Sequence, residues 1–161
     1  AYNEAGTIKE LEQKIATTSA TGKEAKQTVR KLENRMKDLA EIIKYAEQYK
    51  ANKSYNIAYK KAKNPDAYFR KHESQIILYG GARRMLEQAG ISLKGLNIDK
   101  LKAEYQELTA QKNELTATYK NCEKEVKSLN RKLENLNQYL GRTEPQKGAP
   151  EQPDRNNTPA R

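Results

Sequence analysis

Apolar residues recur at alternating steps of three and four near both ends of the chain. One series comprises Ile98, Leu101, Tyr105, Leu108, Leu115, Tyr119, Cys122, Val126, Leu129, Leu133, Leu136 and Leu140. The other comprises Ile8, Leu11, Ile15, Thr18, Gly22, Ala25, Val29, Leu32, Met36, Leu39, Ile43 and Ala46. A repeat of about 3.5 residues keeps a narrow stripe on one side of a helix, as coiled-coil packing requires. The pattern predicts two long helices, over residues 1–50 and 98–140.

Two irregularities interrupt these stripes. Lys112 occupies a stripe position, where a lysine either helps to fix the register or extends its ammonium group to water. Residues 17–22 combine β-branched residues with glycine, which lower helix propensity by up to about 1 kcal/mol each. The helix could break there. Because the apolar register is the same on both sides of the patch, we expect one continuous helix that opens at Thr7.

Between the two series, residues 51–97 form a basic, tyrosine-rich stretch with short helical patterns. Asn64-Pro65-Asp66 predicts a stop and a restart, with Asn64 capping a new helix and Pro65 at its first position. The predicted apolar face of this segment comprises Ile76, Ile77, Tyr79, Ala82, Met85, Leu86 and Ala89. Gly80-Gly81 could kink or split it, Gly90 is the expected C-terminal cap, and Asn97 is the expected cap of the last helix.

The fold class that follows is all-α: an elongated antiparallel helical hairpin with short helices at its tip. A 43-residue helix spans roughly 65 Å. Residues 141–161 contain Gly141 and four of the five prolines, and we expect them to form a disordered tail. The alternative is that each stripe pairs with another molecule, so we expect a monomer or a weak homodimer. The start of the chain, Ala1-Tyr2-Asn3-Glu4, favours a piece of a larger protein.

The residue inventory argues against enzymatic chemistry in this chain. One histidine, His72, and one cysteine, Cys122, cannot furnish a familiar zinc motif or a nucleophile with its base, so we expect no catalytic residue, metal or cofactor. His72 is expected to be exposed, and Cys122 to be a buried thiol. Glu10 with Lys14, Glu33 with Lys37 and Glu123 with Lys127 have the spacing of surface ion pairs within a helix. The longest apolar run, 76–79, is too short to span a membrane.

The net charge of +10 is concentrated in the middle of the chain. Residues 44–94 hold eleven basic and four acidic residues. Cations there alternate with aromatic residues, a mixture that suits phosphate contact and stacking on unpaired bases with little sequence preference. The predicted nucleic-acid-binding residues are Lys50, Lys53, Tyr55, Tyr59, Lys60, Lys61, Lys63, Arg70, Lys71, Arg83 and Arg84. The alternative is that the tyrosines pack the tip and the lysines keep it soluble.

Three segments resemble a known family. The segments are Ile43-Lys44-Tyr45 through Tyr59-Lys60-Lys61-Ala62, Phe69-Arg70-Lys71-His72-Glu73 through Leu78, and Leu101-Lys102-Ala103-Glu104-Tyr105 through Leu108. Over residues 35–130 they resemble the C-terminal helical region of MobA/MobL-type relaxases, the mobilisation nucleases of conjugative transposons. The chain departs from the family pattern at Asn64-Pro65-Asp66 and Gly80-Gly81.

The resemblance implies that the intact protein nicks DNA at the origin of transfer in the bacterial cytoplasm, with its nuclease domain upstream. This chain would then be a non-catalytic accessory domain that contributes DNA binding, or docking to relaxosome or coupling proteins, during conjugation. The alternative function is a coiled-coil interaction or oligomerisation module without a nucleic-acid role. An anionic membrane surface is a weaker possibility because the middle lacks the strongly amphipathic face of Trp, Phe and Leu that such binding uses, and we expect no membrane partner.

Overall fold

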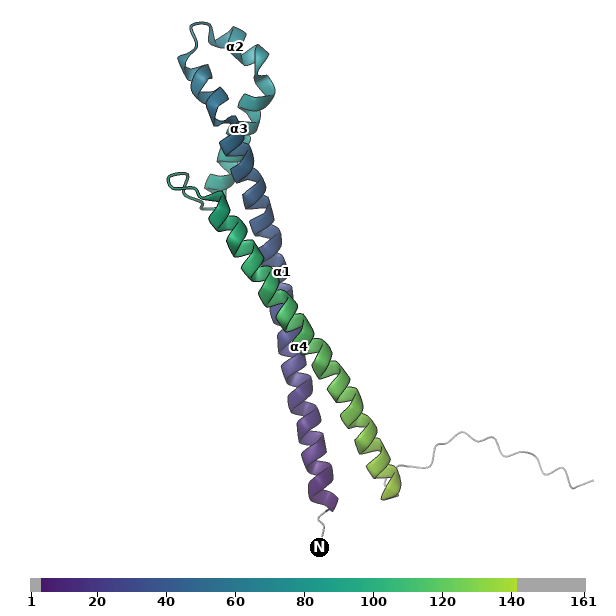
Figure 1. Ribbon diagram of the computed structural model, residues 1–161. Coiled ribbons are helices and arrows are strands. Elements are labelled where there is room, and N and C mark those ends of the chain that lie inside the picture. Colours follow the sequence, from purple (N-terminus) through teal and green to yellow (C-terminus); the bar gives the residue numbers. More distant parts are fainter. Residues whose placement is uncertain (1–3, 142–161) are drawn as a thin grey trace, which may run out of the picture.

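The protein is described by a computed structural model that covers residues 4–141. In that part of the chain the structure is all-α, with four helices: α1 (Glu4–Lys61), α2 (Pro65–Lys71), α3 (Glu73–Gln88) and α4 (Ile98–Tyr139). α1 and α4 pack antiparallel along most of a rod, and α3 packs against the remaining part of α1, with α2 at the far end (Figure 1). The predicted elongated hairpin is confirmed. The expected disorder of the tail concerns residues 142–161, which lie outside the described residues.

The first helix is longer at both ends than the stripe of apolar residues predicts. It begins at Glu4 instead of Thr7 and continues to Lys61 instead of residue 50. The helix continues past residue 50 because Tyr55, Asn56 and Tyr59 are half-buried in the packing with the segment that follows α1. Tertiary packing thus extends the helix beyond the heptads. The tip therefore consists of the last turns of α1 together with α2 and α3.

The patch at residues 17–22 is helical, as the continuous register predicted. The hydroxyl of Thr17 donates to the carbonyl of Gln13 at 2.9 Å, and that of Thr21 donates to the carbonyl of Thr17 at 3.0 Å. Gly22 is buried where α1 meets α4: a Cβ atom placed on it would lie 2.9 Å from the Cβ of Cys122. The glycine thus permits a close approach of the two backbones.

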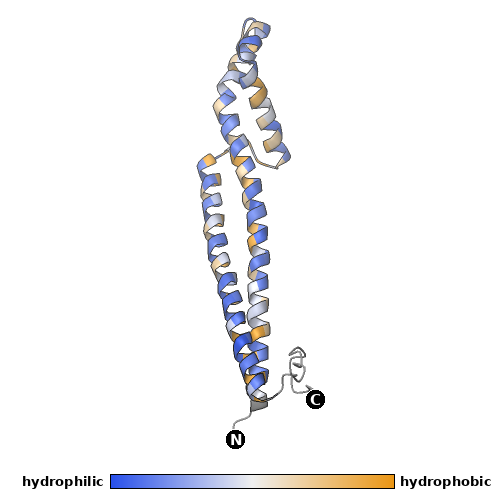
Figure 2. Cartoon of the chain, turned by 90° about the vertical axis from the view of Figure 1, so that its right-hand side faces the viewer, coloured by the Kyte–Doolittle hydropathy of each residue, from blue (hydrophilic) through white to orange (hydrophobic). Residues whose placement is uncertain are grey.

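The core is a thin seam between the helices. Its buried members are Ile8, Ala25, Val29, Met36, Leu39, Ala46, Tyr79, Ala82, Leu86 and Leu129. Leu39 and Leu86 are completely buried, one under α4 and one in the packing of α3 on α1. Polar residues cover most of both long helices, with apolar positions set between them (Figure 2). Cys122 is half-buried, so the expectation of a buried thiol is met in part.

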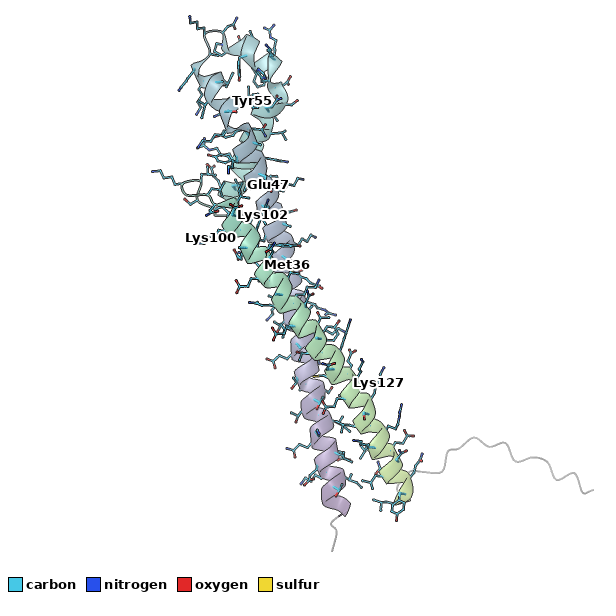
Figure 3. The ribbon with its side chains drawn as sticks, viewed as in Figure 1. Met36, Glu47, Tyr55, Lys100, Lys102 and Lys127 are labelled. Carbon is cyan, nitrogen blue, oxygen red and sulfur yellow. The ribbon has the colours of Figure 1, made fainter. Side chains whose placement is uncertain are left out.

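Ion pairs between α1 and α4 run along the seam. They are Arg35–Glu104 at 3.1 Å, Glu47–Lys102 at 2.8 Å, Glu33–Lys112 at 3.5 Å and Lys14–Glu125 at 3.8 Å. Figure 3 labels Glu47 and Lys102, which lie close to the start of α4. Lys14 and Glu33 were expected to pair within their own helix and instead pair across the seam. Such exposed pairs stabilise by at most about 1 kcal/mol each, but together they favour a single antiparallel register.

The caps predicted at Asn64, Asn97 and Gly90 are confirmed, whereas Thr7 lies inside α1 and does not cap it. The side-chain oxygen of Asn64 accepts from the amide of Ala67 at 3.2 Å, and that of Asn97 accepts from the amide of Lys100 at 3.1 Å. Gly90 follows α3 with a φ of +74°, a conformation that strongly favours glycine. The possible split at residues 80–81 is wrong, because α3 runs without interruption from Glu73 to Gln88.

Candidate nucleic-acid interface

Five of the predicted binding residues gather at the end of the rod. They are Lys60, Lys61, Lys63, Arg70 and Lys71, which we call the end cluster. The break at residues 62–64 turns the chain from α1 into α2, so the last turn of α1 and the last turn of α2 bring their cations to the same end of the molecule (Figure 1). All five side chains are exposed.

The end cluster carries nearly unopposed positive charge. Within residues 60–72 the five cations face one carboxylate, that of Asp66. Asp66 lies in the first turn of α2, where its charge favours the helix dipole. In the described part of the chain, none of the five cations lies within ion-pair distance of a carboxylate. Uncompensated cations on flexible side chains are the groups that replace counterions on a phosphate backbone.

The other four predicted cations lie along the sides of the tip. Lys50 and Lys53, on α1, line a shallow groove of about 290 Å³ beside the loop that precedes α4. Arg83 and Arg84 lie on α3. The Nε of Arg83 donates to Glu87 at 3.0 Å, and this hydrogen bond raises the pKa of the guanidinium above its ordinary value. Arg83 is therefore a weak candidate for phosphate contact, whereas Arg84 is exposed and has no carboxylate within ion-pair distance in residues 4–141.

The two predicted tyrosines pack inside the tip. The ring of Tyr55 lies 5.2 Å from the ring of His72, and the ring of Tyr59 lies 5.8 Å from that of Phe69. Both tyrosines are half-buried. Rings engaged in this way are not displayed as platforms for unpaired bases. Their contacts correspond to the alternative in which the aromatic residues hold the tip together.

His72 was expected to be exposed, and the structure corrects this. It is half-buried between the rings of Tyr55 and Tyr68, with centroids 5.2 and 4.5 Å away. It also stands at the junction where α2 ends and α3 begins. The histidine therefore contributes to the packing of the α2–α3 corner against α1. Within residues 4–141, no group of three or more His, Cys, Asp or Glu side chains is arranged to hold a metal ion.

Farther along the rod from the end cluster, a pair of stacked rings joins α3 to α1. Tyr49 and Tyr79 have ring centroids 5.0 Å apart and an interplanar angle of 21°. Tyr79 is 7% exposed, and this burial raises the pKa of its hydroxyl above the ordinary value; a hydrogen bond with Tyr49 acts in the same direction. The stack keeps the helices that carry the cations in a fixed arrangement.

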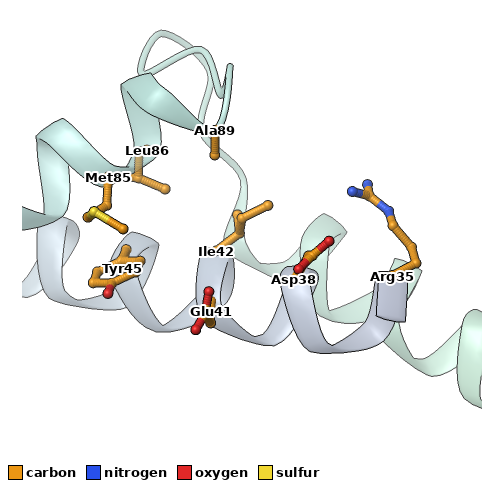
Figure 4. Close-up of a pocket in the computed structure, with 8 residues that line it drawn as sticks. All are labelled: Arg35, Asp38, Glu41, Ile42, Tyr45, Met85, Leu86 and Ala89. Atoms are coloured by element: carbon orange, nitrogen blue, oxygen red, sulfur yellow. The ribbon is translucent and has the colours of Figure 1, made fainter. Parts of the chain in front are cut away.

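The apolar face predicted for residues 76–89 is divided by the structure. Tyr79, Ala82 and Leu86 are buried against α1, but Ile77 and Met85 are 55% and 39% exposed. Helical spacing could have shown that these residues do not all share one face. In a standard α-helix, residue 77 lies about 160° around the helix from Tyr79, and residue 85 lies about 100° from Leu86. Met85 also borders a groove of about 280 Å³, which the sequence did not suggest (Figure 4). The groove is lined as well by Leu86 of α3, by Ala89 just after α3, and by Ile42 and Tyr45 of α1.

No family model, curated protein or solved structure matches this chain. The relaxase resemblance therefore stays a prediction. Within residues 4–141, no helix combines the length and the apolar character that crossing a membrane requires.

Proposed function

We propose that this chain is a non-catalytic accessory domain that contacts the nucleic-acid backbone through the end cluster. The observation that carries the proposal is the concentration of five exposed cations, without ion-pair partners in residues 4–141, at the end of a rigid helical rod. Such a surface recognises phosphates and carries little sequence information. The packing of Tyr55 and Tyr59 favours backbone contact over base stacking.

The shape of the molecule suits an accessory role. α4 has 42 residues and is therefore about 63 Å long. The start of α1 and the end of α4 lie at the end of the rod opposite α2 (Figure 1). A nuclease domain joined upstream of α1 would be held at a distance from the DNA that the end cluster contacts. This arrangement suits the role that the MobA/MobL resemblance implies, in which the accessory domain contributes DNA binding or docking to relaxosome or coupling proteins.

The test measures binding of a short labelled duplex by fluorescence anisotropy at several salt concentrations. Contact with about five phosphates predicts a slope near −4.5 for log affinity against log salt on duplex, and near −3.5 on a single strand. Lys60→Glu, Lys61→Glu and Lys63→Glu together should abolish binding. The matched control reverses Lys23, Lys31 and Lys37, which are exposed lysines of the stem.

The control changes the net charge of the chain by the same amount and should retain most of the affinity. An equal loss of affinity in both triple variants would show that total charge governs binding. Full affinity in the variant at Lys60, Lys61 and Lys63 would reject the end cluster as the contact surface. Far-ultraviolet circular dichroism of each variant checks that the helices are intact.

A second function, a protein-interaction module, is favoured by a different observation. Ile77, Leu78 and Met85 expose apolar side chains on α3 to 55%, 44% and 39%. This function predicts a mass in solution that depends on protein concentration and no response to oligonucleotides.

A further inference from the structure

We infer that the outer face of α3 is a self-association surface that pairs antiparallel with the same face of a second copy of this chain. This inference is independent of the proposed nucleic-acid function. α3 carries two apolar stripes. Tyr79, Ala82 and Leu86 pack against α1, whereas Ile77, Leu78 and Met85 are 55%, 44% and 39% exposed. Met85 also borders the groove between α3 and α1, so it stands at the edge of the outer face.

The outer face is symmetric about Gly81. Its central positions are Ser74, Ile77, Gly81, Met85 and Gln88, with steps of three, four, four and three. Polar residues stand at both ends, an apolar residue stands on each side of the centre, and a glycine stands at the centre. In an antiparallel pair with a two-fold axis at Gly81, Ile77 of one copy meets Met85 of the other, and Ser74 meets Gln88. A surface with this symmetry is complementary to itself.

Neither packing among the described residues nor backbone conformation requires a glycine at position 81. A Cβ atom placed on it would meet nothing within 4 Å, and its φ is not in the left-handed region. Glycine in the interior of a helix costs about 1 kcal/mol relative to alanine. A close approach of a second helix backbone at this position would account for the missing side chain. The space immediately around this position is open.

The charges on α3 favour a second copy over a strongly acidic partner. The helix carries Glu73, Glu87, Arg83 and Arg84, so it has no net charge within a strongly basic tip. Arg83 is paired with Glu87, which leaves Glu73 and Arg84. These two lie on the same edge of the outer face, since helical spacing puts them about 20° apart. In the antiparallel pair, Glu73 comes within about 7.5 Å of Arg84 of the other copy along the axis, which two long side chains can bridge.

The contact is small. Sixteen residues make α3 about 24 Å long, and a strip one helix wide falls well below the roughly 800 Å² per partner of a standard interface. We therefore expect a weak, reversible dimer. The antiparallel arrangement puts the two end clusters at opposite ends of the paired helices, about 24 Å or more apart and beyond the Debye length of about 8 Å at physiological salt. The dimer should therefore change little with salt, whereas nucleic-acid binding weakens steeply with salt, and failure of either proposal is distinguishable from failure of the other.

Sedimentation equilibrium of the whole chain under reducing conditions tests the inference. The expected result is a monomer–dimer equilibrium that changes little with salt and that Ile77→Glu or Met85→Arg weakens at least about tenfold, the equivalent of 1.4 kcal/mol. Mixing the two variants should restore association, because the substitutions place opposite charges at positions that face each other across the axis. A wild-type mass that stays monomeric up to about 1 mM overturns the inference, as does an unchanged dimer in Ile77→Glu.

Cysteine crosslinking tests the position of the axis. In a Cys122→Ser background, Gly81→Cys should form a disulfide-linked dimer under mild oxidation because the two thiols meet at the axis. Gly80→Cys is the matched control, since residue 80 has equally open surroundings but points about 100° away. Equal crosslinking of both variants, or none at residue 81 while the protein is dimeric, rejects pairing about Gly81.

Discussion

Gly22→Ala tests how closely α1 and α4 approach each other. The added Cβ would lie 2.9 Å from the Cβ of Cys122, a distance that carbon atoms of this kind essentially never show. The obstacle is a Cβ atom fixed to the backbone of α4, so rotation of a side chain cannot relieve it. One helix must move, and the seam on either side of this point must follow.

Two effects of opposite sign decide the outcome. Alanine improves helix propensity over glycine by about 1 kcal/mol. Overpacking of a closely fitted site costs about 1–3 kcal/mol. Gly22→Ala should therefore change the free energy of unfolding by between about zero and a loss of 2 kcal/mol. Gly80→Ala is the matched control: its Cβ meets nothing within 4 Å, so it should stabilise the protein by about 1 kcal/mol.

Urea denaturation followed by circular dichroism under reducing conditions measures both variants. Cys122→Gly completes a double-mutant cycle with Gly22→Ala, and the double variant should recover the overpacking cost because the opposing Cβ is gone. A Gly22→Ala variant that is as much stabilised as Gly80→Ala would refute the close approach, and with it this part of the hairpin seam.

Three further predictions concern the seam and the ring stack. Leu39→Ala should cost about 2–5 kcal/mol in urea denaturation because Leu39 is completely buried; a loss below about 1 kcal/mol would contradict its place in the core. Lys112→Leu fills the polar gap in the α4 stripe and gives up one exposed ion pair with Glu33, so the thermal midpoint should rise, and a fall would show that the pair is needed. Tyr79 has a raised pKa, so above about pH 10 its hydroxyl ionises more readily in the unfolded chain, and the free energy of unfolding falls. The free energy of unfolding of the wild-type protein minus that of Tyr79→Phe, measured in urea from about pH 9 to pH 11, should therefore fall as pH rises, and a rise would contradict the burial of this hydroxyl.

The candidate interface shows the limits of composition as a guide. Charge counting located the basic middle, and the exposed lysines of the end cluster agree with it, because charged groups stay in water wherever the chain folds. The roles of the tyrosines depended on neighbours distant in sequence. Tyr55 meets His72 and Tyr59 meets Phe69 only after the turn at residues 62–64 reverses the chain, and no local pattern reports those contacts.

The sequence by itself determined the two long helices, the caps of α2, α3 and α4, and the polar surface, since heptad spacing, Asn64, Gly90 and Asn97 act through local backbone physics. Tertiary structure decided where α1 ends, which residues of α3 are covered, and that Lys14 and Glu33 pair across the seam. The physical reason is that burial is a property of two surfaces in contact. An amphipathic helix shows which face is apolar, but the length and position of its partner decide how much of that face is removed from water.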